Sequence, residues 1–165
     1  MEDVVIRGIS IERNQAQVTV DDVRDEPGIA SRIFSTIAGA NIGVDMIVQS
    51  VSEHGTTDVS FTIHENDLPG VTGVLTPLVK EVRAAGLITK AGVAKLSVVG
   101  IGMRSHSGVA ARLFDCLGKG GINIQLISTS EIKIAVVIDG READRAAQLT
   151  HEEFRLGAFV PPAAG

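Results

Sequence analysis

The sequence predicts an α+β protein made of two similar units, each an antiparallel sheet with helices on one face. The first observation behind this prediction is an internal repeat, which has to be found before any other fold assignment. Residues 28–50 (GIASRIFSTIAGANIGVDMIVQS) and 108–130 (GVAARLFDCLGKGGINIQLISTS) align without a gap. The identical pairs are Gly28/Gly108, Ala30/Ala110, Arg32/Arg112, Phe34/Phe114, Ile42/Ile122, Ile47/Ile127 and Ser50/Ser130.

The second observation is the order of the elements that apolar periodicity predicts in the first repeat. The expected strands are 17–23, 42–51, 58–64 and 87–91, and the helices are 29–38 and a second that starts at 67–70 and ends at Gly86. Pro77 lies inside the second helical pattern and should kink that helix or shift its start. Strand–helix–strand–strand–helix–strand is the ferredoxin-like order, with two helices on one face of the sheet.

The second repeat follows the same order but lacks its fourth strand. Its expected strands are 95–103, 122–129 and 132–138, and its helices are 109–117 and 140–154. A spare strand, 4–12, precedes the first repeat, with a break at Asn14. We expect this strand to complete the second unit, so that the first domain is inserted in the second; a free or dimer-pairing arm is the alternative. The predicted domains are 14–92 and 3–13 plus 93–157, followed by a tail, 158–165.

The turn between the first strand and the first helix, residues 25–30 (DEPGIA), is the main candidate for a binding site. Pro27 fixes φ, and Gly28 lets the backbone turn sharply or approach a ligand. The helix that follows begins with unpaired N–H groups, which attract a carboxylate or phosphate. Taken alone, the same pattern is typical of a plain strand-to-helix turn. The recurrence in the second repeat of the stretch that begins at Gly28, as the stretch that begins at Gly108, favours a functional role.

Composition excludes several function classes. The net charge of −5 and pI near 5.3 argue against nucleic acid as a partner. No apolar run reaches the roughly 20 residues that span a bilayer, and the N-terminus lacks a signal sequence, so we expect a soluble cytoplasmic protein. The single cysteine, Cys116, excludes an internal disulfide and a thiolate metal cluster. We find no histidine pair at metal-ligand spacing, no nucleotide loop and no nucleophile–base–acid set, so we expect no metal, no cofactor and no catalysis by this chain alone.

Four longer stretches carry a resemblance to a known family. They are 45–49 (DMIVQ), 55–61 (GTTDVSF), 94–100 (AKLSVVG) and 123–134 (NIQLISTSEIKI). The layout with its Asp-x-Pro-Gly turn resembles ACT domains, small regulatory modules that bind amino acids. These stretches, over 3–157, resemble the C-terminal regulatory half of bacterial aspartokinase. Nothing resembles that enzyme's Lys-Phe-Gly-Gly-Thr motif. The chain therefore looks like the separate small subunit of an α2β2 aspartokinase, or like a truncated piece of a longer enzyme.

The resemblance implies feedback control. In such proteins threonine, lysine or both bind the ACT pair of a homodimer and inhibit phosphorylation of aspartate by a catalytic partner chain. The ligand lies between the Asp-x-Pro-Gly turn of one domain and the second strand of another. Two alternatives stay open: a purely structural assembly module that binds no small ligand, and a standalone ACT regulator that binds another amino acid.

The chemistry of a free amino acid selects the candidate residues. Its carboxylate suits the first amides of the helix, its ammonium needs a carboxylate such as Asp25 or Asp45, and Gln49 can both donate and accept. Each residue also has a simpler role, since Asp25 and Asn123 can cap turns, Asp45 can be a plain strand residue, and Glu131 can be a hairpin acid. The expected ligand-binding residues are Asp25, Gly28, Ile29, Ala30, Gly43, Val44, Asp45, Gln49, Val109, Ala110, Asn123, Ile124, Ser130 and Glu131.

Within the second repeat, Val109 and Ala110 would wall the pocket, Asn123 and Ile124 would close it, and Ser130 with Glu131 would reach a longer ligand such as lysine. The turn of this repeat, 104–108 (RSHSG), has serine where Pro27 stands and no counterpart of Asp25. We therefore expect its site to be weak, differently tuned or absent. Ser52 and Thr62 lie near one hairpin and are expected to influence inhibition through packing.

Overall fold

The structure is a computed structural model that describes residues 5–50, 54–101 and 106–154. It divides into two compact units, a first unit of Asn14–Ala91 and a second unit of Met1–Arg13 with Gly92–Gly165. Two long strands, β1 (Val5–Arg24) and β4 (Gly86–Ile101), contribute to both units. The α+β class and the two antiparallel units predicted from the sequence are confirmed. The predicted tail, 158–165, lies outside the described residues.

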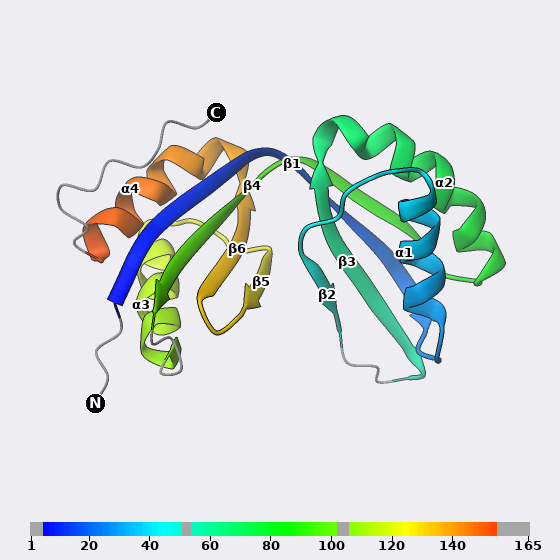
Figure 1. The fold of residues 1–165 in the computed structure, drawn as a ribbon, viewed down its shortest axis with the longest axis horizontal. Helices are drawn as coiled ribbons and strands as arrows, with labels where there is room; N and C mark the ends of the chain where they lie inside the picture. The colour runs from blue at the N-terminus through cyan, green and yellow to red at the C-terminus, as the bar shows by residue number, and fades with distance from the viewer. Residues whose placement is uncertain (1–4, 51–53, 102–105, 155–165) are drawn as a thin grey trace. The chain divides into compact units, whose positions relative to one another are not determined.

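The first unit has the strand order β2-β3-β1-β4, with α1 and α2 on one face of its sheet (Figure 1). Strands β2 and β3 are antiparallel neighbours, and β3 is antiparallel to β1. This is the ferredoxin-like arrangement expected from the sequence. Its remaining elements are α1 (Ile29–Gly39), β2 (Ile47–Gln49), β3 (Thr56–His64), the short helix η1 (Glu65–Asp67) and α2 (Leu68–Glu81).

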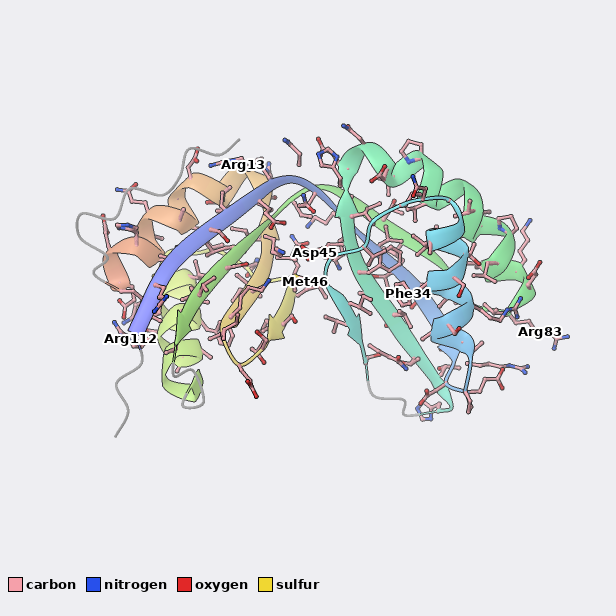
Figure 2. All side chains as sticks on the ribbon, in the orientation of Figure 1. Arg13, Phe34, Asp45, Met46, Arg83 and Arg112 are labelled. Atoms are coloured by element: carbon pink, nitrogen blue, oxygen red, sulfur yellow. The ribbon has the colours of Figure 1, made fainter. Side chains whose placement is uncertain are left out.

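Apolar residues on one face of each element form the core of the first unit. Phe61 of β3 is fully buried, and the Phe34 ring of α1 meets it edge-on with centroids 5.5 Å apart (Figure 2). Burial of such side chains stabilises each by about 1.5–3 kcal/mol. The core also contains Ala16, Val18, Val20, Val23, Ile29, Ile33, Ile37, Val59, Ile63, Val71, Leu75, Leu78 and Val82.

The second unit repeats this layout with the strand order β1-β4-β6-β5. The N-terminal part of β1 belongs here: Ile9 packs in the core of this unit, and Glu12 pairs with the buried Lys95 of β4 at 3.4 Å. The N-terminal strand thus supplies the fourth strand of the unit. Its other elements are α3 (His106–Lys119), β5 (Leu126–Thr129), β6 (Lys133–Asp139), the short helix η3 (Gly140–Glu142) and α4 (Ala143–Glu153).

The recurring arginines join the two helices of each unit. Arg32 of α1 pairs with Glu81 of α2 at 2.8 Å, and Arg112 of α3 pairs with Glu153 of α4 at 3.1 Å. The Arg112 guanidinium also lies 4.7 Å from the ring centroid of Phe154. The repeat of these arginines therefore has a structural explanation, an inter-helix ion pair in each unit.

Several predicted boundaries are wrong. Asn14 does not end a strand, because β1 runs through it with a φ of 58°, and β4 likewise runs through Gly92 with a φ of 69°. The second strand of each repeat is shorter than expected, Ile47–Gln49 instead of 42–51 and Leu126–Thr129 instead of 122–129. Helix α2 has Pro69 in its first turn, runs through Pro77 and ends at Glu81, before the expected Gly86. Asn, Gly and Pro are break signals in a sequence, and here the sheet and helix contacts outweigh them.

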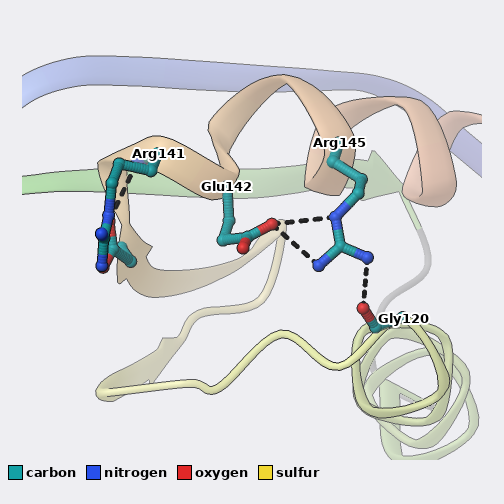
Figure 3. Close-up of polar contacts among 5 residues, drawn as sticks. Gly120, Arg141, Glu142 and Arg145 are labelled. Carbon is teal, nitrogen blue, oxygen red and sulfur yellow. Dashed lines mark hydrogen bonds and ion pairs between the residues drawn. The ribbon is translucent and has the colours of Figure 1, made fainter.

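Polar contacts connect the segment that contains η3 and the start of α4 to the chain that follows α3 (Figure 3). Arg145 donates to the Glu142 carboxylate at 2.8 Å and to the carbonyl oxygen of Gly120. Arg141 binds the Asp139 carboxylate at 2.8 Å. The chain that leaves α3 is thereby held against the start of α4.

Candidate functional site

The turn before α1 has the backbone geometry that the sequence predicts for a helix start. Gly28 caps α1 with a φ of 93°, and a Cβ there would meet no other atom within 4 Å, so the positive φ rather than lack of space requires glycine. The Asp25 N–H donates to the Gly55 carbonyl at 2.9 Å, which holds the turn to β3. No described side chain caps α1, and Asp25, Gly28 and Ala30 are exposed while Ile29 lies in the core.

The second group of predicted residues lies on and before β2, the edge strand of the first unit. Gly43, Val44 and Asp45 belong to the connection that enters β2, and the Asp45 N–H donates to the Thr62 carbonyl at 3.0 Å. Gln49 ends the strand opposite Val59 of β3. Asp45 and Gln49 are both exposed, as a ligand contact requires.

The strand register separates the two groups within the first unit. Gln49 lies opposite Val59, which is opposite Val20, so Gln49 is near the end of the sheet where β1 leads to the turn. Asp45 binds Thr62, which lies opposite Gln17, eight residues before Asp25. At 3.3 Å per residue this is roughly 25 Å along the strand. Asp45 and the helix start of the same unit are therefore too far apart to bind one free amino acid.

The predicted residues of the second unit divide in the same way. Ser130 and Glu131 are exposed in the β5–β6 hairpin, and the Ser130 N–H donates at 2.8 Å to Lys133, which is opposite Val99 near the end of β4. Val109 is buried and Ala110 half-buried in the first turns of α3, the helix that follows β4. Exposed Asn123 and half-buried Ile124 precede β5. The first residue of β5, Leu126, lies opposite Val137 of β6, which in turn lies opposite Lys95 near the middle of β4.

Part of the second turn cannot be compared with the first. Residues 102–105 lie outside the described part of the chain, as does Ser52 in the first unit. The expected loss of the acceptor at 104–108 therefore stays a prediction.

The hydroxyl of Thr62, a residue expected to act through packing, fixes the backbone that enters β2. Thr62 is fully buried, and its Oγ1 accepts the Met46 N–H at 3.1 Å. The corresponding residue of the second unit is Val137, because the Gln125 N–H donates to its carbonyl as the Asp45 N–H does to that of Thr62. The first unit therefore fixes Asp45 and Met46 by one side-chain bond that the second unit lacks.

We expect Thr62→Val to destabilise the first unit by about 1–2 kcal/mol, because a buried N–H loses its partner while the side-chain volume is kept. Chemical denaturation monitored by circular dichroism measures this loss. Thr72→Val is the matched control, since the Thr72 hydroxyl is exposed on α2 and donates to the Leu68 carbonyl. A Thr62→Val variant as stable as the control would show that the bond contributes nothing.

Three carboxylates lie together where β1 approaches the turn. A hydrogen bond with Asp58 raises the pKa of Asp21 most, and burial and the negative charges of Asp58 and Asp22 raise it further. Because the folded pKa lies above the unfolded one, Asp21 contributes stability below the unfolded pKa, and this contribution is lost as pH rises through the folded pKa.

Asp21→Asn should therefore be slightly more stable than the parent at about pH 7.5, by a few tenths of a kcal/mol for this half-buried surface group, and should match it at about pH 3. Thermal unfolding at both pH values tests this. A variant less stable than the parent at the higher pH would contradict the proposed repulsion.

A hollow of the described surface lies elsewhere. It measures 460 Å³ and contains none of the predicted site residues; its lining is Thr76, Val79, Lys80, Arg83, Ala84, Ala85, Gly86 and Leu87. Among the described residues no group of three metal-ligating side chains was found, and no described helix is long and apolar enough to cross a membrane.

Comparison with known proteins identifies the two units. A family model of the ACT domain matches residues 18–75 and 96–154. The aspartate kinase of Pseudomonas fluorescens (strain SBW25) is 47% identical over 158 residues, which are 96% of this chain and 38% of that protein. A solved structure of aspartokinase alpha and beta subunits is 44% identical, with a TM-score of 0.84 over 92% of this chain and 99% of the matched chain. The chain belongs to the aspartokinase family.

The regulatory subunit of aspartate kinase from Thermus flavus agrees with this assignment. It is 32% identical, with a TM-score of 0.84, over 91% of this chain and 99% of its own. The chain thus corresponds to the ACT-domain regulatory part of an aspartokinase. It spans 38% of the length of the Pseudomonas fluorescens relative.

Proposed function

We propose that this chain is the non-catalytic regulatory part of an aspartate kinase, which binds threonine, lysine or both in the cytoplasm and transmits feedback inhibition to a catalytic chain. The observation that carries the proposal is the match to a solved regulatory subunit over 99% of that subunit's length. A chain that aligns with nearly the whole of a regulatory subunit suits a sensor that acts on a catalytic part.

The separation of the candidate residues within a unit supports a site shared by two domains. The helix start of one domain would bind the ligand carboxylate through the amides of Gly28 and Ala30, where the helix dipole also favours an anion. The Ile29 N–H donates to the Glu26 carbonyl at 3.3 Å and would have to leave it to join them. The ammonium would bind a carboxylate contributed by another domain, with Asp45 as the candidate. This division explains why Asp45 lies so far from the turn of its own unit.

Dimerisation through ACT domains would bring the two halves together, and an α2β2 assembly would connect them to the catalytic chains. Inhibition then requires that the effector bind one arrangement of the assembly more tightly than the other. Bound threonine would stabilise the inhibited arrangement, and the catalytic chains would follow.

The alternative is an assembly module that binds no small ligand. The exposed Asp45 and Gln49 and the uncapped α1 favour the sensor, because assembly alone does not need polar groups at these places. A kinase assay separates the two functions. The catalytic chain would be assayed for phosphorylation of aspartate with and without this chain, over a range of threonine and then lysine concentrations.

We expect inhibition by the amino acid only when this chain is present. Inhibition of the catalytic chain alone to the same extent would contradict the proposal. Restored kinase activity that ignores both amino acids would support the assembly module instead.

A further inference from the structure

Asp58, on β3, bonds to both segments that carry candidate residues at the turn end of the first unit. Its N–H donates to Ser50 Oγ at 3.0 Å, and its carbonyl oxygen accepts the Ser50 N–H at 3.1 Å. Its carboxylate Oδ1 accepts the Asp22 N–H at 2.8 Å. Ser50 directly follows Gln49, and Asp22 lies three residues before Asp25. One residue therefore connects the end of β2 to the end of β1.

The bond to Asp22 lies at a β-bulge. The register between β1 and β3 shifts between Val20 and Val23, and Asp22 has a φ of 53°, a left-handed conformation that residues other than glycine rarely adopt. A bulge changes the direction of its strand and leaves one residue outside the ladder. Because Asp58 accepts the N–H of that residue, it stabilises the bulge from which the chain enters the turn.

The second unit has no equivalent of this carboxylate. Gln49 pairs with Val59 as Thr129 pairs with Ile134, so the counterpart of Asp58 is Lys133. Among the described residues of this unit, the corresponding bond is the backbone bond from the Ser130 N–H to the Lys133 carbonyl. The connection through a carboxylate thus belongs to the unit that has the Asp-x-Pro-Gly turn.

We propose that Asp58 is a positioning residue for the effector site: it fixes the bulge at Asp22 and, through it, the turn 25–30. The link to the effector rests on the function proposed above. Removal of the Asp58 carboxylate should therefore change the geometry of the turn and, through it, the affinity for the effector.

Two variants distinguish the hydrogen-bond acceptor that Asp58 provides from the negative charge that it carries. Asp58→Asn keeps an oxygen that accepts the Asp22 N–H but removes the charge, and Asp58→Ala removes both. Asp115→Asn is the matched control, since Asp115 is an exposed aspartate of α3 paired with Lys119. The first readout needs no ligand: it is the set of amide ¹H–¹⁵N chemical shifts of Gly28 and Ala30. The second readout is the Kd for threonine and for lysine, measured by calorimetry.

The control should match the parent in both readouts. Asp58→Asn should keep the turn amide shifts close to those of the parent and the affinity within about twofold. Asp58→Ala should shift the turn amides and weaken binding by about fivefold to tenfold, as the loss of one hydrogen bond implies.

Turn amides in Asp58→Ala that match those of the parent would overturn the positioning role, whether or not any ligand binds. If the parent binds neither amino acid, alone or in complex with a catalytic chain, the proposed function fails, while the amide shifts still decide on Asp58. If the parent binds and Asp58→Ala binds equally well, the positioning role fails and the proposed function stands.

Discussion

Replacing Gln49 by alanine is expected to weaken threonine binding tenfold or more while leaving thermal unfolding unchanged. Gln49 is exposed on an edge strand and belongs to neither core cluster, so its removal opens no cavity. Its amide can donate to a ligand carboxylate or accept from a ligand hydroxyl. Loss of a hydrogen bond to a charged group costs about 1.5–3 kcal/mol, which is tenfold or more in Kd. Isothermal titration calorimetry with each variant measures the change.

Asp45→Ala is expected to have an effect of similar size, because it removes the proposed partner of the ligand ammonium. The control for Gln49→Ala is Gln148→Ala, a glutamine-to-alanine substitution at an exposed position of α4. There the Gln148 side chain contacts Glu152 at 3.4 Å. We expect the control to bind like the parent. Unchanged affinity in both Gln49→Ala and Asp45→Ala would show that β2 and the connection before it do not contribute to the site.

The substitution Gly140→Ala, which adds one methyl group, is expected to destabilise the second unit by about 2–3 kcal/mol. A Cβ there would lie 2.6 Å from the carbonyl oxygen and 3.2 Å from the carbonyl carbon of Gly92. Both atoms belong to the backbone of β4, so the contact cannot be relieved by rotating a side chain. For a protein of this size the loss corresponds to a fall in Tm of roughly 5–10 °C.

Gly73→Ala provides the matched control for this prediction. Gly73 lies within α2, and a Cβ there would meet nothing within 4 Å. Alanine is favoured over glycine in a helix by about 1 kcal/mol, so this variant should be more stable than the parent. Differential scanning calorimetry of both variants tests the pair. A Gly140→Ala protein with the Tm of the parent would contradict the close approach of η3 to β4.

The fold was predictable because the repeat and the apolar periodicity are local signals. The alignment of 28–50 with 108–130 predicts two copies of one unit before any element is assigned. The continuous strands were not predictable, because Asn14 and Gly92 look like breaks in a sequence. Both residues lie at the boundaries between the two compact units, where β1 and β4 pass from one to the other.

The candidate site was predictable only in part. Gly28 and the start of α1 follow from a short pattern of residues. The distance between Asp45 and that turn depends on strand register, which no local pattern encodes. The role of Asp58 depends on one side-chain bond to a backbone amide 36 residues away, and such a bond leaves no periodic signal.

The measurement that tests the central claim most directly is a calorimetric titration of the purified chain with threonine and then with lysine. The chain has no tryptophan or tyrosine, so intrinsic fluorescence is a poor substitute. We expect saturable binding of at least one of the two amino acids, and its loss in Gln49→Ala. The absence of binding by either amino acid, both to the chain alone and to its complex with a catalytic chain, would contradict the account of this protein as an amino-acid sensor.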